Sequence, residues 1–166
     1  MTFRATILLI VTVCLSETVH SQQAGVLNAH NAVYIELGGP GMLYSVNYEY
    51  RIVRQFSLRA GFTIWKFPFL IASVDMMAAP VMINLLLGGR HANLEIGIGL
   101  LAGRAAGEWL IGGGSLGETT FVVGTGTIGY RHQSIDGGFV FRIGFTPVFS
   151  SDGLLPAFGL SMGHSF

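Results

Sequence analysis

The chain has 166 residues, of which 51% are hydrophobic and only 11% are charged, and its formal net charge is zero. This is the length of one domain, with more apolar and fewer charged residues than an ordinary soluble domain. The charge balance, with Lys66 as the only lysine, excludes a basic surface for nucleic acid. The 24 glycines follow no three-residue period, which excludes a collagen-like chain.

The amino-terminal segment has the features of a secretory signal peptide. Arg4 precedes an apolar run that ends near Leu15, and residues 19–21 suit a signal peptidase. We therefore expect residues 1–21 to be a signal peptide that is removed after Ser21. The run is too short to span about 30 Å of hydrocarbon as an anchor. The only cysteine, Cys14, lies within this segment, so the mature chain is expected to hold neither a disulfide nor a cysteine metal site.

Beyond a predicted periplasmic linker (22–31), apolar residues recur on every second position, which is the period of a β-strand. The clearest run is residues 44–52, where three tyrosines, a valine and an isoleucine alternate with polar residues. The same pattern predicts eight strands, near residues 33–37, 44–52, 56–65, 81–87, 94–100, 119–131, 139–146 and 158–166. The links at 66–77 and 103–118 are expected to be the longest.

Eight amphipathic strands of this length predict an all-β fold, an eight-stranded antiparallel transmembrane β-barrel over residues 32–166. An even strand number puts both termini on one side, so the short turns would be periplasmic and the longer links would face outward. A helical membrane protein is the first rival, but the apolar runs 78–87 and 94–101 are too short for a helical span. A soluble β-sandwich is the second rival, and it would leave one face of each strand charged and wet, whereas here these faces are small.

The positions predicted to face the barrel interior include several charged residues. Charges that are removed from bulk water must be paired, and Arg and Glu can pair in bidentate fashion. We therefore expect an ion-pair network that plugs the lumen, with all members except Glu36 toward the periplasmic end: Glu36, Glu49, Arg51, Arg59, Glu95, Arg131 and Arg142. A proton or ion path is the alternative interpretation of the same residues.

Glycines are also frequent at the positions predicted to face inward. They either make room for large side chains in a narrow barrel or leave a small pocket near the outer end, and the narrowness of eight-stranded barrels favours the first interpretation. The positions are Gly61, Gly97, Gly99, Gly124, Gly126, Gly144, Gly159 and Gly163.

Three stretches carry a resemblance to known proteins: residues 128–133, residues 138–147 and the terminal Phe166. They resemble small outer-membrane β-barrel proteins of the Bacteroidetes type, and the mature chain more loosely resembles the eight-stranded OmpA and OmpX class. The resemblance implies a place in the bacterial outer membrane, contact with outer-membrane lipid, and insertion by the barrel assembly machinery. The implied assembly signal is Phe158, Leu160 and Phe166, while His164 departs from the aromatic residue that is common at its position.

Motifs that suggest chemistry lack the context that the chemistry needs. Residues 124–129 match a GxGxxG spacing, but a strand end and a turn follow where a dinucleotide site needs a helix. His164 and Ser165 are neighbours on a strand and should face opposite sides, so they cannot act as base and nucleophile. His30, His91 and His132 lack metal-ligand spacing. No catalytic, cofactor or metal site is therefore predicted.

These observations predict a structural or surface-interaction barrel that acts through its outward links and is not an enzyme. A small pore or small-ligand transport barrel is the alternative within the same fold. A lipid-modifying outer-membrane enzyme is the alternative from another class. The surface ligand or partner protein is not indicated by the sequence.

Overall fold

A computed structural model describes residues 26–68, 72–109, 115–151 and 153–166, so the predicted signal peptide lies outside the described residues. The described chain is built from strands and one short 3-10 helix, η1 (Gly39–Gly41). It holds no helix that is long and apolar enough to cross a membrane. The strands are β1 (Asn31–Gly38), β2 (Tyr44–Val53), β3 (Phe56–Pro68), β4 (Ala72–Gly88), β5 (Ala92–Trp109), β6 (Ser115–Gln133), β7 (Gly138–Phe145), β8 (Val148–Ser150), β9 (Gly153–Leu155) and β10 (Phe158–Ser165).

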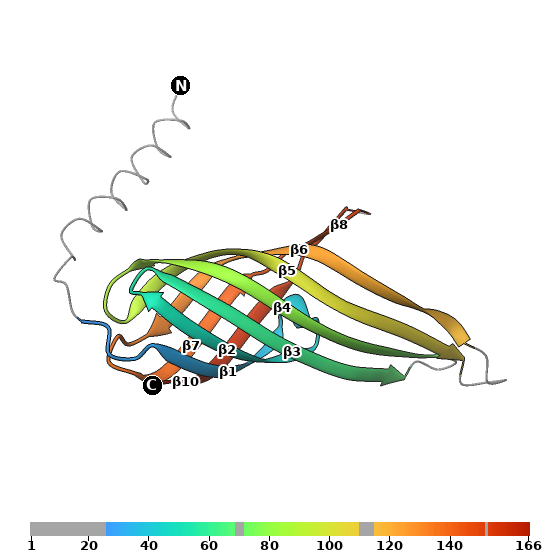
Figure 1. The fold of residues 1–166 in the computed structure, drawn as a ribbon, viewed down its shortest axis with the longest axis horizontal. Helices are drawn as coiled ribbons and strands as arrows, with labels where there is room; N and C mark the ends of the chain where they lie inside the picture. The colour runs from blue at the N-terminus through green and yellow to red at the C-terminus, as the bar shows by residue number, and fades with distance from the viewer. Residues whose placement is uncertain (1–25, 69–71, 110–114, 152) are drawn as a thin grey trace, which may run out of the picture.

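Eight of these strands close into an antiparallel barrel in the order β1 to β7 and then β10 (Figure 1). Closure is made by β10, which pairs with β7 on one edge and with β1 on the other. Asn31 and Phe166 extend this seam through two backbone hydrogen bonds of 2.9 and 2.8 Å. The predicted all-β, eight-stranded barrel is thus confirmed. We call the end that carries Asn31 and Phe166 the terminal end, and the opposite end the distal end.

Alternation along each strand sends one set of side chains outward and the next set into the lumen. The outward set is apolar and exposed, including aromatic side chains near the terminal end such as Tyr48, Tyr50 and Tyr130. Soluble proteins rarely expose a continuous apolar surface of this extent, so lipid is its natural environment. Further members of this outer apolar belt are Val33, Ile35, Val46, Leu58, Phe62, Val81, Ile83, Ile98, Leu100, Ile128, Ile143 and Met162.

The prediction of long links at 66–77 and 103–118 is wrong. In the structure β3 continues to Pro68 and β4 begins at Ala72, while β5 continues to Trp109 and β6 begins at Ser115. Backbone pairing between neighbouring strands extends them, with Lys66 opposite Asp75 and Arg104 opposite Thr120. The link between β7 and β10 contains the short hairpin of β8 and β9.

The extended parts of β3 to β6 form a four-stranded sheet that projects beyond the rest of the barrel (Figure 1). We call it the distal sheet, and it comprises residues 63–68, 72–78, 103–109 and 115–123. The pairing of β2 with β3 reaches only to Phe62, and β8 pairs with β6 no further than Gly124. Beyond these pairs only β3 to β6 continue the wall of the barrel. The inner face of the distal sheet is therefore not covered by strands from the opposite wall.

The barrel accommodates a proline in the middle of β4 by a local gap in the backbone pairing. Pro80 of β4 lacks the N–H group that a central strand donates, and the pairing of β3 with β4 is interrupted between Ala60 and Thr63. Gly61 occupies this gap. A Cβ atom there would overlap the side-chain oxygen of Asn47 and lie 2.9 Å from Cγ of Pro80.

Chain segments cross both ends of the lumen. Toward the distal end, the three residues of η1 are buried, and the Trp65 indole donates a hydrogen bond of 3.2 Å to the carbonyl of Gly41. Gly38 and Gly39 have positive φ angles of 72° and 63°, which turn the chain inward at this point. At the terminal end, the backbone N–H groups of residues 28 and 29 both donate to the carbonyl of Ile135, a buried residue in the turn between β6 and β7.

Candidate functional site

The middle of the lumen contains a network of ion pairs. It joins six of the seven charged residues that the sequence predicts to face inward, and their side chains are almost completely buried. The barrel brings them together from six of its strands, because the inward positions of neighbouring strands lie side by side. We call this set the lumen network: Glu36, Glu49, Arg59, Glu95, Arg131 and Arg142.

Glu95 and Arg142 form a bidentate ion pair in the lumen network. Nε and Nη2 of Arg142 donate hydrogen bonds of 2.7 and 2.5 Å to the two carboxylate oxygens of Glu95. Arg131 lies 2.6 Å from Oε1 of Glu49 and 3.8 Å from Oε2 of Glu95, so it links the two carboxylates. Tyr34 donates a 2.8 Å hydrogen bond to the other oxygen of Glu49. The guanidinium carbon of Arg142 lies 4.9 Å from the centre of the Tyr34 ring.

Glu36 is the one predicted member of the ion-pair network that the sequence does not place toward the periplasmic end of its strand. The structure places its carboxylate in an ion pair with Arg59, and Nη1 of Arg142 lies 4.0 Å from its Oε1. Arg59 reaches across β2, and on the way its Nε donates a 2.9 Å hydrogen bond to Asn47. The small inward residue Ser45 lies 3.4 Å from the same carboxylate. The length of the arginine side chain thus joins charges from β3 and β1.

Arg51 is the one predicted member that stands outside these pairs in the described part of the barrel. Only 1% of its surface is exposed, and neither Nε nor Nη1 has a hydrogen-bond partner. Its backbone is fixed by His30, whose carbonyl accepts from the Arg51 N–H at 2.7 Å and whose Nδ1 lies 2.8 Å from the Arg51 carbonyl.

Little free volume remains around the lumen network. A cavity of about 10 Å³ lies beside Glu36, Glu95 and Arg142, which is room for about one water molecule. A Cβ atom on Gly163 would overlap Tyr34, and one on Gly159 would lie 2.9 Å from Oε1 of Glu36. At these two positions, glycine makes room for large neighbouring side chains, as in the first of the two interpretations above.

An apolar cluster occupies the lumen on the distal side of the network. Met76, Ala78 and Leu101 are buried there, with Trp65, Phe121 and Val123 packed against them. Sequence reasoning missed this cluster because it regarded residues 66–77 and 103–118 as links. The signal was Trp65 itself, a large aromatic side chain at an inward position of its strand.

An open apolar groove lies on the inner face of the distal sheet. Its volume is about 330 Å³, and it is lined by Met42 and Leu43 from the connection after η1, by Trp65 and Phe67 of β3, and by Val74 of β4. Met42, Leu43 and Phe67 are between 43% and 46% exposed. The sequence did not predict this groove.

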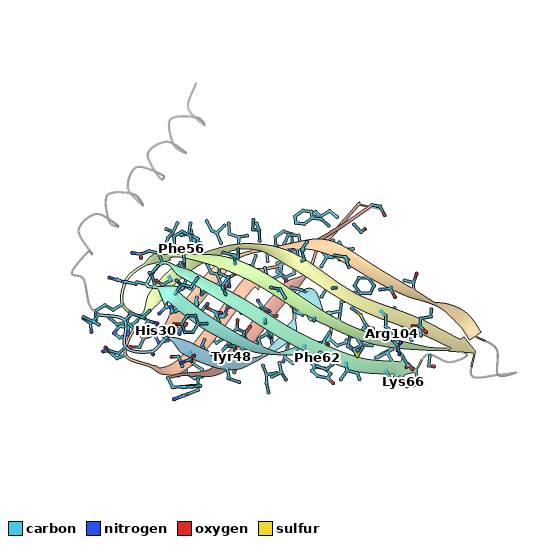
Figure 2. All side chains as sticks on the ribbon, in the orientation of Figure 1. His30, Tyr48, Phe56, Phe62, Lys66 and Arg104 are labelled. Carbon is cyan, nitrogen blue, oxygen red and sulfur yellow. The ribbon has the colours of Figure 1, made fainter. Side chains whose placement is uncertain are left out.

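The outer face of the distal sheet differs from the apolar belt below it, because it carries charges. Lys66 pairs with Asp75 at 3.1 Å, and Arg104 pairs with Glu118 at 3.0 Å, with more than 40% of each side chain exposed. Figure 2 shows Lys66 and Arg104 toward the distal end of the molecule, beyond Phe62. Charged side chains are costly in hydrocarbon, so this charge line marks the distal limit of the lipid-facing surface.

His164 and Ser165 lie on opposite faces of β10, and the residues of the predicted assembly signal lie on the outer face of the barrel. His164 is exposed on the outer face, whereas Ser165 is buried and its hydroxyl donates a 3.2 Å hydrogen bond to the carbonyl of Gly138. No group of three or more potential metal ligands occurs within the described ranges. Phe158 and Phe166 are exposed by 72% and 59% on the outside of the barrel, and Leu160 is half-buried.

Comparison with solved structures places this geometry among known folds. The N-terminal β-barrel domain of Pseudomonas aeruginosa OprF aligns with a TM-score of 0.63 at 15% sequence identity, over 84% of this chain and all of that domain. The chain has the fold of small eight-stranded outer-membrane β-barrels. Ail, the attachment invasion locus protein of Yersinia pestis, aligns with a TM-score of 0.57 at 12% identity, over 84% of this chain and 99% of Ail.

A second structure of Ail, in complex with the heparin analogue sucrose octasulfate, aligns with the same TM-score at 13% identity over the same shares of the two chains. No protein-family model matches the barrel sequence, and the comparison with curated proteins finds no match. At these identities the likeness concerns the fold.

Proposed function

We propose that this protein is an outer-membrane barrel with a filled lumen that acts at the cell surface by binding a partner protein through the distal sheet. The observation that carries the proposal is the apolar groove of about 330 Å³ on the inner face of that sheet. An apolar hollow of this size beside half-exposed Met42, Leu43 and Phe67 is a typical recognition feature.

The position of the groove favours a protein partner over lipid. The groove opens on the inner face of the sheet, whereas the lipid-facing surface is on the outer face and ends at the charge line of Lys66, Asp75, Arg104 and Glu118. Both termini of the barrel lie at the other end, and in barrels with an even strand number that end faces the periplasm. The distal sheet would then stand outside the cell, where apolar side chains of another protein can enter the groove.

The sulfated ligand of Ail does not carry over to this chain. Lys66 and Arg104, the cations of the distal sheet, each face a carboxylate at about 3 Å, so the sheet offers no net positive charge to a polysulfate. An enzyme is also disfavoured, since the exposed His164 and the buried Ser165 point to opposite faces of β10.

The experiment uses Trp65 as a reporter, because its ring lines the groove. The barrel carries Trp109→Phe, so that Trp65 is the only tryptophan, and is placed in phosphatidylcholine nanodiscs to avoid detergent in the groove. We expect octapeptides of alternating leucine and threonine to shift the Trp65 emission to the blue in a saturable manner. Octapeptides of alternating serine and threonine should not.

Leu43→Asp places a charge in the groove and should abolish the shift. Phe149→Asp is the matched control, because Phe149 is 49% exposed on β8, outside the groove, and should leave the shift unchanged. A response that is the same for both peptides, or that survives Leu43→Asp, would show that the groove is not the binding site.

A further inference from the structure

The charges buried in the lumen do not balance. Four arginines and three glutamates have at most 4% of their surface exposed inside the described barrel, so the interior carries one positive charge in excess. Removing a charge from water costs several kcal/mol unless a counter-charge accompanies it. The buried residues are Arg51, Arg59, Arg131 and Arg142 against Glu36, Glu49 and Glu95.

The excess resides at Arg51. The other three arginines each lie within 4.0 Å of a glutamate, whereas Arg51 forms no ion pair in the described part of the barrel. Its Nε and Nη1 are buried donors without acceptors. Arg131 acts on Arg51 with a repulsive charge and Glu49 with an attractive one, but no carboxylate lies within ion-pair distance of Arg51 in the described part of the barrel.

The neighbour of Arg51 on β3 does not supply an acceptor for its guanidinium. Ser57 lies directly opposite Arg51, is fully buried, and its hydroxyl interacts with the Glu49 carboxylate. Buried polar groups are almost always hydrogen-bonded in folded proteins, so the unused Nε and Nη1 donors of Arg51 indicate an absent acceptor.

We propose that a small monovalent inorganic anion, chloride under ordinary conditions, is bound in the lumen beside Arg51. One negative charge neutralises the excess, and an ion that only accepts hydrogen bonds matches the free N–H groups of Arg51. A water molecule satisfies the donors but leaves the charge uncompensated. The ion is part of the folded interior, because residues 28 and 29 bind Ile135 across the same end of the barrel.

The direct test is crystallography of the barrel refolded in sodium bromide, with anomalous data collected at the bromine edge. We expect an anomalous peak in contact with the Arg51 guanidinium. Water density alone at that position, or no peak within the lumen, would overturn the proposal.

A second measurement compares urea unfolding midpoints after refolding in sodium chloride and in sodium gluconate at equal ionic strength, since gluconate is too large for a buried site. The midpoint should be higher in chloride and should rise with the logarithm of its concentration. Arg51→Met should remove this dependence. Arg90→Met, which deletes an exposed arginine at the same end, should retain it. Equal midpoints for the wild-type barrel in the two salts would contradict the proposal even if Arg51→Met failed to fold.

Discussion

Arg142 of β7 and Glu95 of β5 face each other inside the barrel and are joined by two hydrogen bonds, of 2.7 and 2.5 Å. The strand between them, β6, contributes Arg131, which lies 3.8 Å from the same carboxylate. One glutamate therefore compensates the charge of two buried arginines, so its loss should cost more stability than the loss of an exposed ion pair.

Glu95→Gln should strongly destabilise the barrel. The substitution keeps the shape of the side chain but leaves Arg142 and Arg131 with less compensating charge in the interior. Breaking a buried pair on one side costs about 3–5 kcal/mol. Urea unfolding in bilayers measures the loss, with Glu118→Gln as the exposed control, for which we expect about 0–1 kcal/mol. A similar loss in both variants would mean that the buried pair contributes no more than a surface pair.

Gly163→Ala should impair packing at the seam of the barrel. The added Cβ atom would overlap the backbone oxygen of Val33 and the side chain of Tyr34, both on the neighbouring strand β1. Overpacking of this kind costs about 1–3 kcal/mol. Gly124→Ala is the control, because its Cβ atom would meet Phe149 at an ordinary distance of 3.5 Å. Unfolding midpoints of the two variants should therefore differ, and equal midpoints would show that the seam tolerates the extra atom.

Phe166→Ser should reduce the yield of inserted barrel in cells. The prediction follows from the resemblance to barrels whose last strand ends in an aromatic assembly signal. The substitution retains the two backbone hydrogen bonds between residues 31 and 166. Phe139→Ser removes an equally exposed aromatic side chain from β7 and serves as control. Heat-modifiable gel mobility of outer-membrane fractions measures insertion. Normal insertion of Phe166→Ser would show that Phe166 is not needed as an assembly signal.

The wild-type barrel should give no stepwise conductance in planar bilayers. The network, the apolar cluster and η1 follow one another along the lumen, and the cavity beside Glu36 measures only about 10 Å³. The double variant Glu95→Ala with Arg142→Ala opens space in the network alone, and it should also remain closed because the apolar cluster and η1 still fill the lumen. Regular conductance steps from the wild-type barrel would favour the small-pore alternative.

The strands of the barrel could be predicted because alternation is strong where one face meets lipid and the other meets polar side chains. The distal sheet could not. Around Met76 and Met77, and again around Ala105 and Ala106, consecutive residues are similar, so the period of two disappears although backbone pairing continues.

The partners within the lumen network were beyond the sequence for a different reason. Inward positions could be identified, but the pairing of Arg59 with Glu36 depends on strand register and on the reach of a side chain across β2. The groove beside Trp65 depends on how the connection at Met42 folds toward the lumen. Both are properties of closure, which the pattern along a single strand does not encode.

Cysteine labelling on intact cells tests the central claim, that the distal sheet stands outside and the terminal end faces the periplasm. The only native cysteine is Cys14, in the predicted signal peptide, so each introduced thiol reports alone. Thr119→Cys lies on the distal sheet and Gln55→Cys lies in the turn between β2 and β3, and both positions are exposed. A membrane-impermeant maleimide should label Thr119→Cys in intact cells and Gln55→Cys only after the outer membrane is permeabilised. The reverse pattern, or labelling of neither residue before permeabilisation, would contradict the account.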